Sequence, residues 1–146
     1  MPFPPSTPSM PSTPITIEHT VRARLLSSPD AEQVPATLHY DSSDPLALAV
    51  TFPAEAALEG SEVTWVFGRD LLAAALRGPA GEGDVRFWSD HPGRTLLELR
   101  APQGTAVVEL GTRELDRFLA ATYAFVPTTD ELTRLNLDHT ITALLT

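Results

Sequence analysis

No cysteine occurs among the 146 residues, which excludes a disulfide framework, a thiol nucleophile and a thiolate metal site. Lysine is absent as well, so all ten basic residues are arginine, against 19 aspartate and glutamate residues. The formal net charge is -9 with histidine neutral. Binding to nucleic acid is disfavoured at this charge, because proteins that follow a phosphate backbone rely on clustered cationic side chains.

Apolar runs are short. A stretch such as residues 71–76 falls well short of the roughly 18–20 residues that a membrane-spanning helix needs. The start of the chain also lacks the basic segment and apolar stretch of a secretory signal. We therefore expect no membrane span and a cytoplasmic protein, with a length that suits a single domain.

Proline is abundant at the start of the chain. Six of the 14 prolines lie within residues 1–14, a stretch without any charged side chain. Proline removes backbone donors and favours extended geometry, so this composition predicts a disordered, proline-rich tail. Residues 15–146 are then expected to form the folded domain.

Two-residue alternation of apolar and polar side chains begins at Ile15 and is typical of a half-buried strand. Similar patterns recur along the chain, separated by turn-forming residues. The residues Pro102, Gln103 and Gly104 predict a tight hairpin connection, and residues 90–93 predict a turn. The seven predicted strands are 15–25, 34–40, 46–52, 62–67, 84–89, 95–101 and 105–110.

Helical spacing appears in three places. Residues 69–77 carry leucines one turn apart and end at glycine and proline. A second stripe follows Thr112, which we expect to cap that helix. Thr128 and Glu131 have the spacing of a capping box for a third. The order of elements predicts an α+β domain of about seven mostly antiparallel strands and three helices.

Catalytic and metal-binding patterns are not found. Asp41 and Asp44 have the spacing for an acid–base pair in a small hydrolase, but the serines and proline around them favour a turn. The glycine-rich residues 78–83 precede Asp84 and a strand rather than a helix, which favours a linker turn over a phosphate loop. We expect no enzyme activity, cofactor or metal. The histidines, which share no metal-ligand spacing, are His19, His39, His91 and His139.

Aromatic side chains are the remaining feature. Phe67 and Phe87 fit a core, whereas Trp65 and Trp88 fit an oligomer or partner surface, where aromatic residues are enriched. The run of Arg86, Phe87 and Trp88 also resembles the way single-strand binders interleave basic and stacking residues. A single-stranded nucleic-acid-binding protein is therefore the alternative hypothesis, with the net charge against it.

Four blocks of sequence resemble the SsgA-like proteins, actinobacterial regulators of sporulation and septum placement. The blocks are VPATLHYD at 34–41, WVFGRDLL at 65–72, GEGDVRFW at 81–88 and NLD at 136–138. The resemblance covers about residues 17–145, so the domain predicted over 15–146 is an SsgA-like domain. In this context Arg69 and Arg86 are expected to hold carboxylates at a subunit boundary.

This resemblance implies a whirly-like fold, a homotrimer and no cofactor or catalytic residue. It also implies a regulator or adaptor of sporulation-specific cell division that acts at division septa through protein contacts. Those contacts would place the septum and recruit FtsZ, directly or through another SsgA-like protein. The candidate contact residues are Trp65, Arg69, Arg86 and Trp88.

Overall fold

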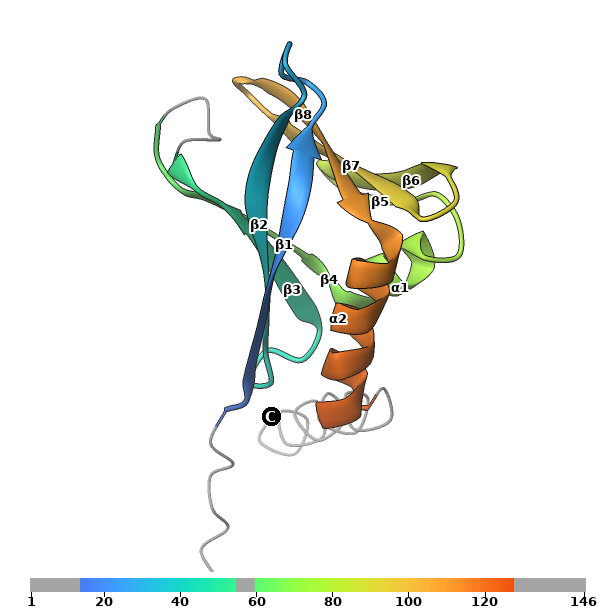
Figure 1. Cartoon of the computed structure of the whole chain (residues 1–146). Helices are drawn as coiled ribbons and strands as arrows, with labels where there is room; N and C mark the ends of the chain where they lie inside the picture. The colour runs from blue at the N-terminus through green and yellow to red at the C-terminus, as the bar shows by residue number, and fades with distance from the viewer. Residues whose placement is uncertain (1–13, 55–59, 128–146) are drawn as a thin grey trace, which may run out of the picture.

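The computed structural model describes residues 14–54 and 60–127, which form an α+β fold of eight antiparallel strands and two helices (Figure 1). Residues 1–13 of the tail predicted over 1–14, and the third predicted helix, lie outside the described residues. In chain order the elements are β1 (Thr16–Leu25), β2 (Glu32–Asp41), β3 (Ala47–Phe52), β4 (Val63–Gly68), α1 (Arg69–Ala75), β5 (Ala80–Glu82), β6 (Val85–His91), β7 (Arg94–Ala101), β8 (Gly104–Gly111) and α2 (Thr112–Phe125).

The order of elements repeats within the chain, although the sequence shows no repeat. Each half is a four-stranded antiparallel meander followed directly by a helix. In both halves the first helical N–H donates to the carbonyl that precedes the third strand. Arg69 donates to Leu46 at 2.7 Å, and Thr112 donates to Gly93 at 3.0 Å. The two helices therefore leave the sheet at equivalent points.

Thr112 is not the cap that the sequence predicts. It is the first residue of α2, and the capping position is held by Gly111, which makes no side-chain cap hydrogen bond. The hydroxyl of Thr112 lies 2.7 Å from the hydroxyl of Thr95 in β7, which is buried. Because this hydroxyl pairs with another strand, the start of α2 is anchored by tertiary contact rather than by its own cap.

The sheet has the order β4-β3-β2-β1-β8-β7-β6-β5 and curls so that its two ends approach each other (Figure 1). The rings of Phe67 in β4 and Phe87 in β6 meet edge to face, with centroids 5.4 Å apart. The short helix α1 connects these two ends and packs against β4, β5 and β6. The core lies inside the curled sheet, where α2 packs against β1 and β8.

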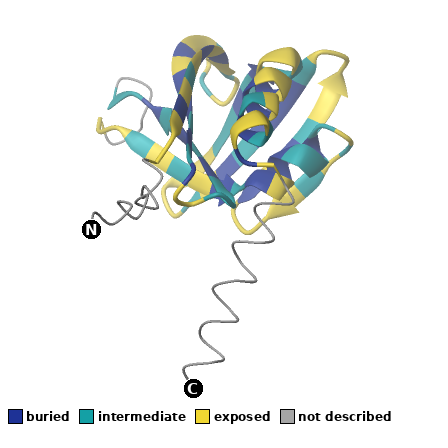
Figure 2. Ribbon diagram, turned by 90° about the horizontal axis from the view of Figure 1, so that it is seen from below, coloured by how far each residue is buried: buried dark blue, intermediate teal, exposed yellow. Residues whose placement is uncertain are grey.

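The predicted alternation of β1 is confirmed. Ile17, Val21 and Ala23 are buried, whereas Glu18 and Arg22 between them are exposed. A stripe of α2 is buried in the same way against the inner face of the sheet (Figure 2). Fully burying one aliphatic or aromatic side chain stabilises a fold by roughly 1.5–3 kcal/mol. The members of the α2 stripe are Leu115, Phe118, Leu119 and Thr122.

The glycine-rich segment at 78–83 is not only a linker turn, so that prediction is wrong. Residues 80–82 form β5, which pairs with β6 and gives the sheet eight strands instead of seven. Gly83 then enters a two-residue hairpin loop with a φ of +59°, in the left-handed region that glycine tolerates best. A strand of three residues containing small side chains has no apolar alternation for sequence reading to detect.

Arg69 is the charged residue at the centre of the joint between the two halves. It is 0% exposed, and its Nη1 donates to the backbone carbonyl of Val126 at 2.8 Å. Its guanidinium carbon lies 4.2 Å from the centre of the Tyr123 ring and 5.2 Å from that of Tyr40. A buried charge is tolerated only when it is paired in this way. Arg69 therefore connects the start of α1, the end of α2 and strand β2.

We predict that Arg69→Met destabilises the protein by about 2–4 kcal/mol, because the carbonyl of Val126 loses its donor and two rings lose their cation. Methionine keeps most of the side-chain volume, so a simple cavity does not explain the loss. Chemical unfolding followed by circular dichroism measures the change. Arg77→Met, at an exposed position just after α1, is the matched control and should change stability by less than about 0.5 kcal/mol. Equal stability of the two variants would contradict the role given to Arg69.

Candidate interaction surface

The four predicted contact residues do not form one surface. Arg69 is completely buried, so it has no surface to offer a partner and leaves the set of candidates. Trp65 is half-buried on the inner face of β4, where it packs against the core. Arg86 and Trp88 lie two residues apart on the outer face of β6, because their neighbours Val85 and Phe87 point into the core.

Trp88 belongs to a row of side chains that crosses the outer face of the sheet. Its register partner on β7 is Leu96, which pairs with Glu109 of β8, and Glu109 pairs with Arg24 of β1. Leu96 is only 5% exposed although it is not part of the main core cluster. Sequence alternation points Leu97 and Leu99 inward and gives no signal that Leu96 is also buried.

Arg86 holds a carboxylate, but one from its own chain. Its Nη1 lies 3.9 Å from Glu98 Oε1 on the neighbouring strand β7. Arg100 donates from Nε to the same oxygen at 3.0 Å. Both arginines remain more than half exposed at the side chain, so this group of charges still faces outward.

The turn between β6 and β7 is held by an ion pair. The predicted turn at residues 90–93 is narrower than expected, since only residues 92–93 lie outside the strands. Arg94 donates to both carboxylate oxygens of Asp90, at 3.1 Å from Nε and 2.6 Å from Nη2. The hydrogen bond from Arg94 lowers the pKa of Asp90 below its ordinary value, and the same bond raises the pKa of Arg94. Arg94 Nη1 also lies 3.4 Å from Glu109 Oε2.

A hollow of about 340 Å³ lies where β1 and β8 separate. β1 pairs with β2 along all ten residues, but with β8 only at Arg24 and Leu25. Beyond that point the two strands diverge, and three arginines reach the opening: Arg22, Arg24 and Arg94. We call this opening the basic hollow. Its complete lining is Arg22, Arg24, Gln33, His91, Pro92, Gly93, Arg94, Glu109, Leu110 and Gly111.

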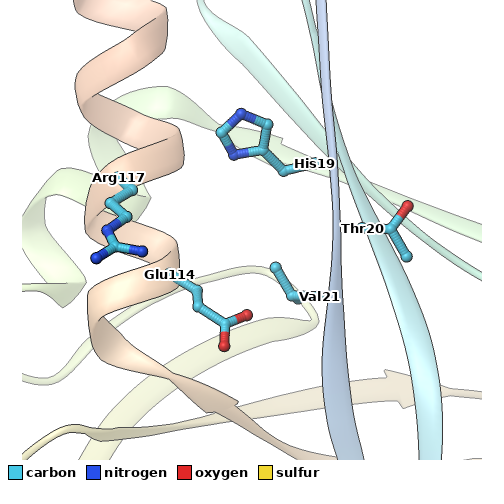
Figure 3. A pocket seen from close by; sticks show the side chains of 5 residues that line it. All are labelled: His19, Thr20, Val21, Glu114 and Arg117. Carbon is cyan, nitrogen blue, oxygen red and sulfur yellow. The ribbon is translucent and has the colours of Figure 1, made fainter.

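A second hollow, of about 430 Å³, lies nearer the N-terminal end of β1, between this strand and α2 (Figure 3). His19 projects from β1 toward α2, and Glu114 projects from α2 toward β1. The imidazole of His19 meets the ring of Phe118 edge to face at 5.4 Å, so this histidine is mainly a packing residue. The remaining lining residues are Thr20, Val21 and Arg117.

Asp41 and Asp44 lie in the predicted turn, and the carboxylate of Asp41 is hydrogen-bonded within it. Asp41 Oδ1 accepts hydrogen bonds from the backbone N–H of Ser43 at 2.9 Å and from its hydroxyl at 2.8 Å. These bonds lower the pKa of Asp41. The backbone N–H of Asp44 donates to the carbonyl of Asp41 at 3.0 Å. Across residues 14–54 and 60–127, no group of three acidic or histidine side chains is placed to hold a metal ion.

His39 lies on the outer face of β2, as the alternation predicts, and its Nδ1 is 3.0 Å from Glu18 Oε1 on β1. Neither helix in the described ranges has the length and apolar character to cross a membrane. The structure thus presents a patterned outer face of aromatic and charged side chains, with two hollows beside the diverging part of β1.

Comparison with known proteins identifies relatives over most of the chain. The sequence profile of the family described as Streptomyces sporulation and cell division protein, SsgA, matches residues 34–131. The sporulation-specific cell division protein SsgB of Streptomyces coelicolor is 40% identical over 134 residues, covering 89% of this chain and 96% of the relative. SsgB of Salinispora tropica is 41% identical over 137 residues, covering 90% and 94%.

Solved structures give the same result. A structure reported with SsgB mutations that correlate with longitudinal cell division during sporulation of Streptomyces coelicolor matches with a TM-score of 0.71 and 40% identity, covering 82% of this chain and 95% of that chain. The SsgA-like sporulation-specific cell division protein of Thermobifida fusca matches with a TM-score of 0.69 and 32% identity, covering 90% and 95%.

We predict a pH dependence that originates in the ion pair between Asp90 and Arg94. Because the folded-state pKa of Asp90 is lowered, this carboxylate stabilises the fold above its ordinary pKa of about 3.9, and the contribution disappears as pH falls through the lowered value. Asp90→Asn should therefore be less stable than the original chain at neutral pH, with a difference that shrinks on acidification to about pH 2. Denaturation midpoints across this range measure the effect.

Asp30→Asn is the matched control for this experiment. Asp30 is exposed in the connection between β1 and β2, and no ion pair involves its side chain in the described part of the chain. Its variant should keep the same stability difference at every pH. A constant difference for Asp90→Asn would show that the ion pair is not responsible.

Proposed function

The chain belongs to the SsgA family of sporulation and cell division proteins, and from that premise we propose that it is a non-enzymatic adaptor. It acts in sporulation-specific cell division through protein–protein contacts, at division septa in the cytoplasm. Its role is to help place the septum and recruit FtsZ, directly or through another SsgA-like protein. The candidate acid Asp41 supports this reading, because its carboxylate accepts hydrogen bonds within its own turn.

The observation that carries the proposal is the outer face around Trp88. A half-buried tryptophan stands beside the exposed Arg86, in a row that leads across the sheet to Arg24. Tryptophan and arginine are the residues that most often dominate the energy of protein–protein contacts. This face lies on the opposite side of the sheet from the core, so it is available without any change of fold.

We predict that Trp88→Ala reduces recovery of division proteins in a pull-down from sporulating cells by roughly tenfold or more, because a central aromatic contact is lost. Trp65→Ala is the matched control. It removes a tryptophan from the inner face of the same sheet, and recovery should fall only as far as its lower stability reduces folded protein. Equal losses in both variants would contradict a contact role for Trp88. Failure of the original chain to recover any division protein would contradict the adaptor function.

We also propose that the protein assembles as a homotrimer, the state that the family resemblance implies. Static light scattering of the purified chain is expected to give about three times the 15.8 kDa mass of one chain. Trp88→Ala and Arg86→Ala, measured in parallel, separate a self-association surface from a partner surface. A strictly monomeric species at the concentration found in cells would contradict the assembly without touching the pull-down result.

A further inference from the structure

One edge of β1 is open between residues 16 and 22. Leu26 donates its backbone N–H to the carbonyl of Val107 in β8 at 2.8 Å, so even-numbered residues of β1 direct their main-chain groups to the β8 side. The same alternation directs the N–H and C=O groups of Glu18, Thr20 and Arg22 away from β2. β8 pairs only with Arg24 and Leu25, so no described strand lies against this part of β1. We call it the open edge.

Positive charge is concentrated where the open edge ends, next to the two residues of β1 that pair with β8. The basic hollow contains three arginines and one glutamate, in a chain whose net charge is -9. Arg94 is already engaged by Asp90 and Glu109. In the described part of the chain, by contrast, the side chains of Arg22 and Arg24 form no ion pair or hydrogen bond. Two exposed guanidinium groups are thus free to bind carboxylates.

Both hollows border the same edge. The basic hollow lies at Arg22 and Arg24, and the second hollow lies at Thr20 and its neighbours, between β1 and α2. Together they leave space beside an unpaired strand. An unpaired strand edge is a template for a further strand, whose main chain completes the ladder and whose alternate side chains provide specificity.

We propose that an extended acidic peptide segment of a partner protein binds as an added strand along the open edge of β1. Its carboxylates face Arg22 and Arg24 on the outer side of the sheet. The alternate side chains face the second hollow on the inner side, between His19 on β1 and Glu114 on α2, and are therefore small. The bound sequence accordingly alternates acidic with small residues.

The charges along the edge favour a peptide over a nucleic acid. Glu18 on the edge, Glu109 in the basic hollow and Glu114 in the second hollow interrupt the positive surface, so a continuous row of phosphates would meet carboxylates. A peptide with carboxylates only at every second residue can place them at the arginines, and its N–H and C=O groups satisfy the strand edge. The inference takes from the proposed function only that the partner is a protein.

The test is a titration of the purified, ¹⁵N-labelled full chain, followed by its backbone amide signals. The probe is an acetylated and amidated peptide of about ten residues with alternating threonine and glutamate, the strand-forming pattern that the edge requires. Amides at 16–24 and 109–111 are expected to shift. A peptide of alternating threonine and glutamine should bind at least roughly tenfold more weakly, because its side chains carry no charge for the arginines.

Two further comparisons separate the contribution of charge to peptide binding from the contribution of main-chain pairing. The double variant Arg22→Gln with Arg24→Gln should weaken binding roughly tenfold or more, while Arg77→Gln, an exposed arginine outside both hollows, should leave it unchanged. A glutamate peptide that is N-methylated at every second residue keeps its charge but cannot complete the ladder, and it should lose binding.

Several results would overturn the proposal. These are equal binding of the glutamine peptide, equal binding of the N-methylated peptide, shifts confined to other strands, or no shifts at millimolar peptide. Tighter binding of a thymidine oligonucleotide or of anionic phospholipid vesicles at the same amides would also overturn it. The titration uses only the purified chain, whereas the pull-down from sporulating cells tests the adaptor function, so the two proposals fail separately.

Discussion

The enclosure of the Arg69 guanidinium is the interaction on which the arrangement of the two halves depends. The guanidinium donates a hydrogen bond to the backbone carbonyl of Val126, directly after α2, and so links the start of α1 to the end of α2. It also lies against the ring of Tyr40 in β2. A cation without these contacts would be costly to bury. The start of α1, the end of α2 and strand β2 therefore meet around this one side chain. The edge-to-face contact of Phe67 and Phe87 lies at the same junction.

The sheet itself contributes little to joining the halves. β1 and β8 pair at only two residues, whereas β1 pairs with β2 at ten residues and β7 pairs with β8 at eight. The two helices and the contacts of Arg69 provide the other connections between the halves. β1 and β8 therefore diverge where β8 ends and α2 begins. The open edge and both hollows follow from this divergence. The surface that we propose for partner binding is thus a consequence of how two similar meanders are joined.

The sequence predicts an element correctly where apolar residues recur at one regular spacing. It fails where a side chain is buried although its residue type is ordinarily exposed. The strands of the first half follow from apolar alternation, as in Ile17 to Ala23. The family resemblance places Arg69 at a subunit boundary, and only the rings around it reveal an interior position. The exposed phase of β1 already shows Arg22 and Arg24, but Arg94 joins them from seventy residues away through the strand order.

The amino-acid sequence by itself determined the class of fold, most element boundaries, the acidic character and the family, because these depend on local periodicity, composition and short blocks of residues. The tertiary structure alone decided which arginine is buried, that Leu96 is covered on the outer face, that β5 exists and where β1 has no neighbour. These features depend on pairing between distant strands. The register and the order of the strands decide which distant residues become neighbours, and no single segment of the sequence specifies either of them.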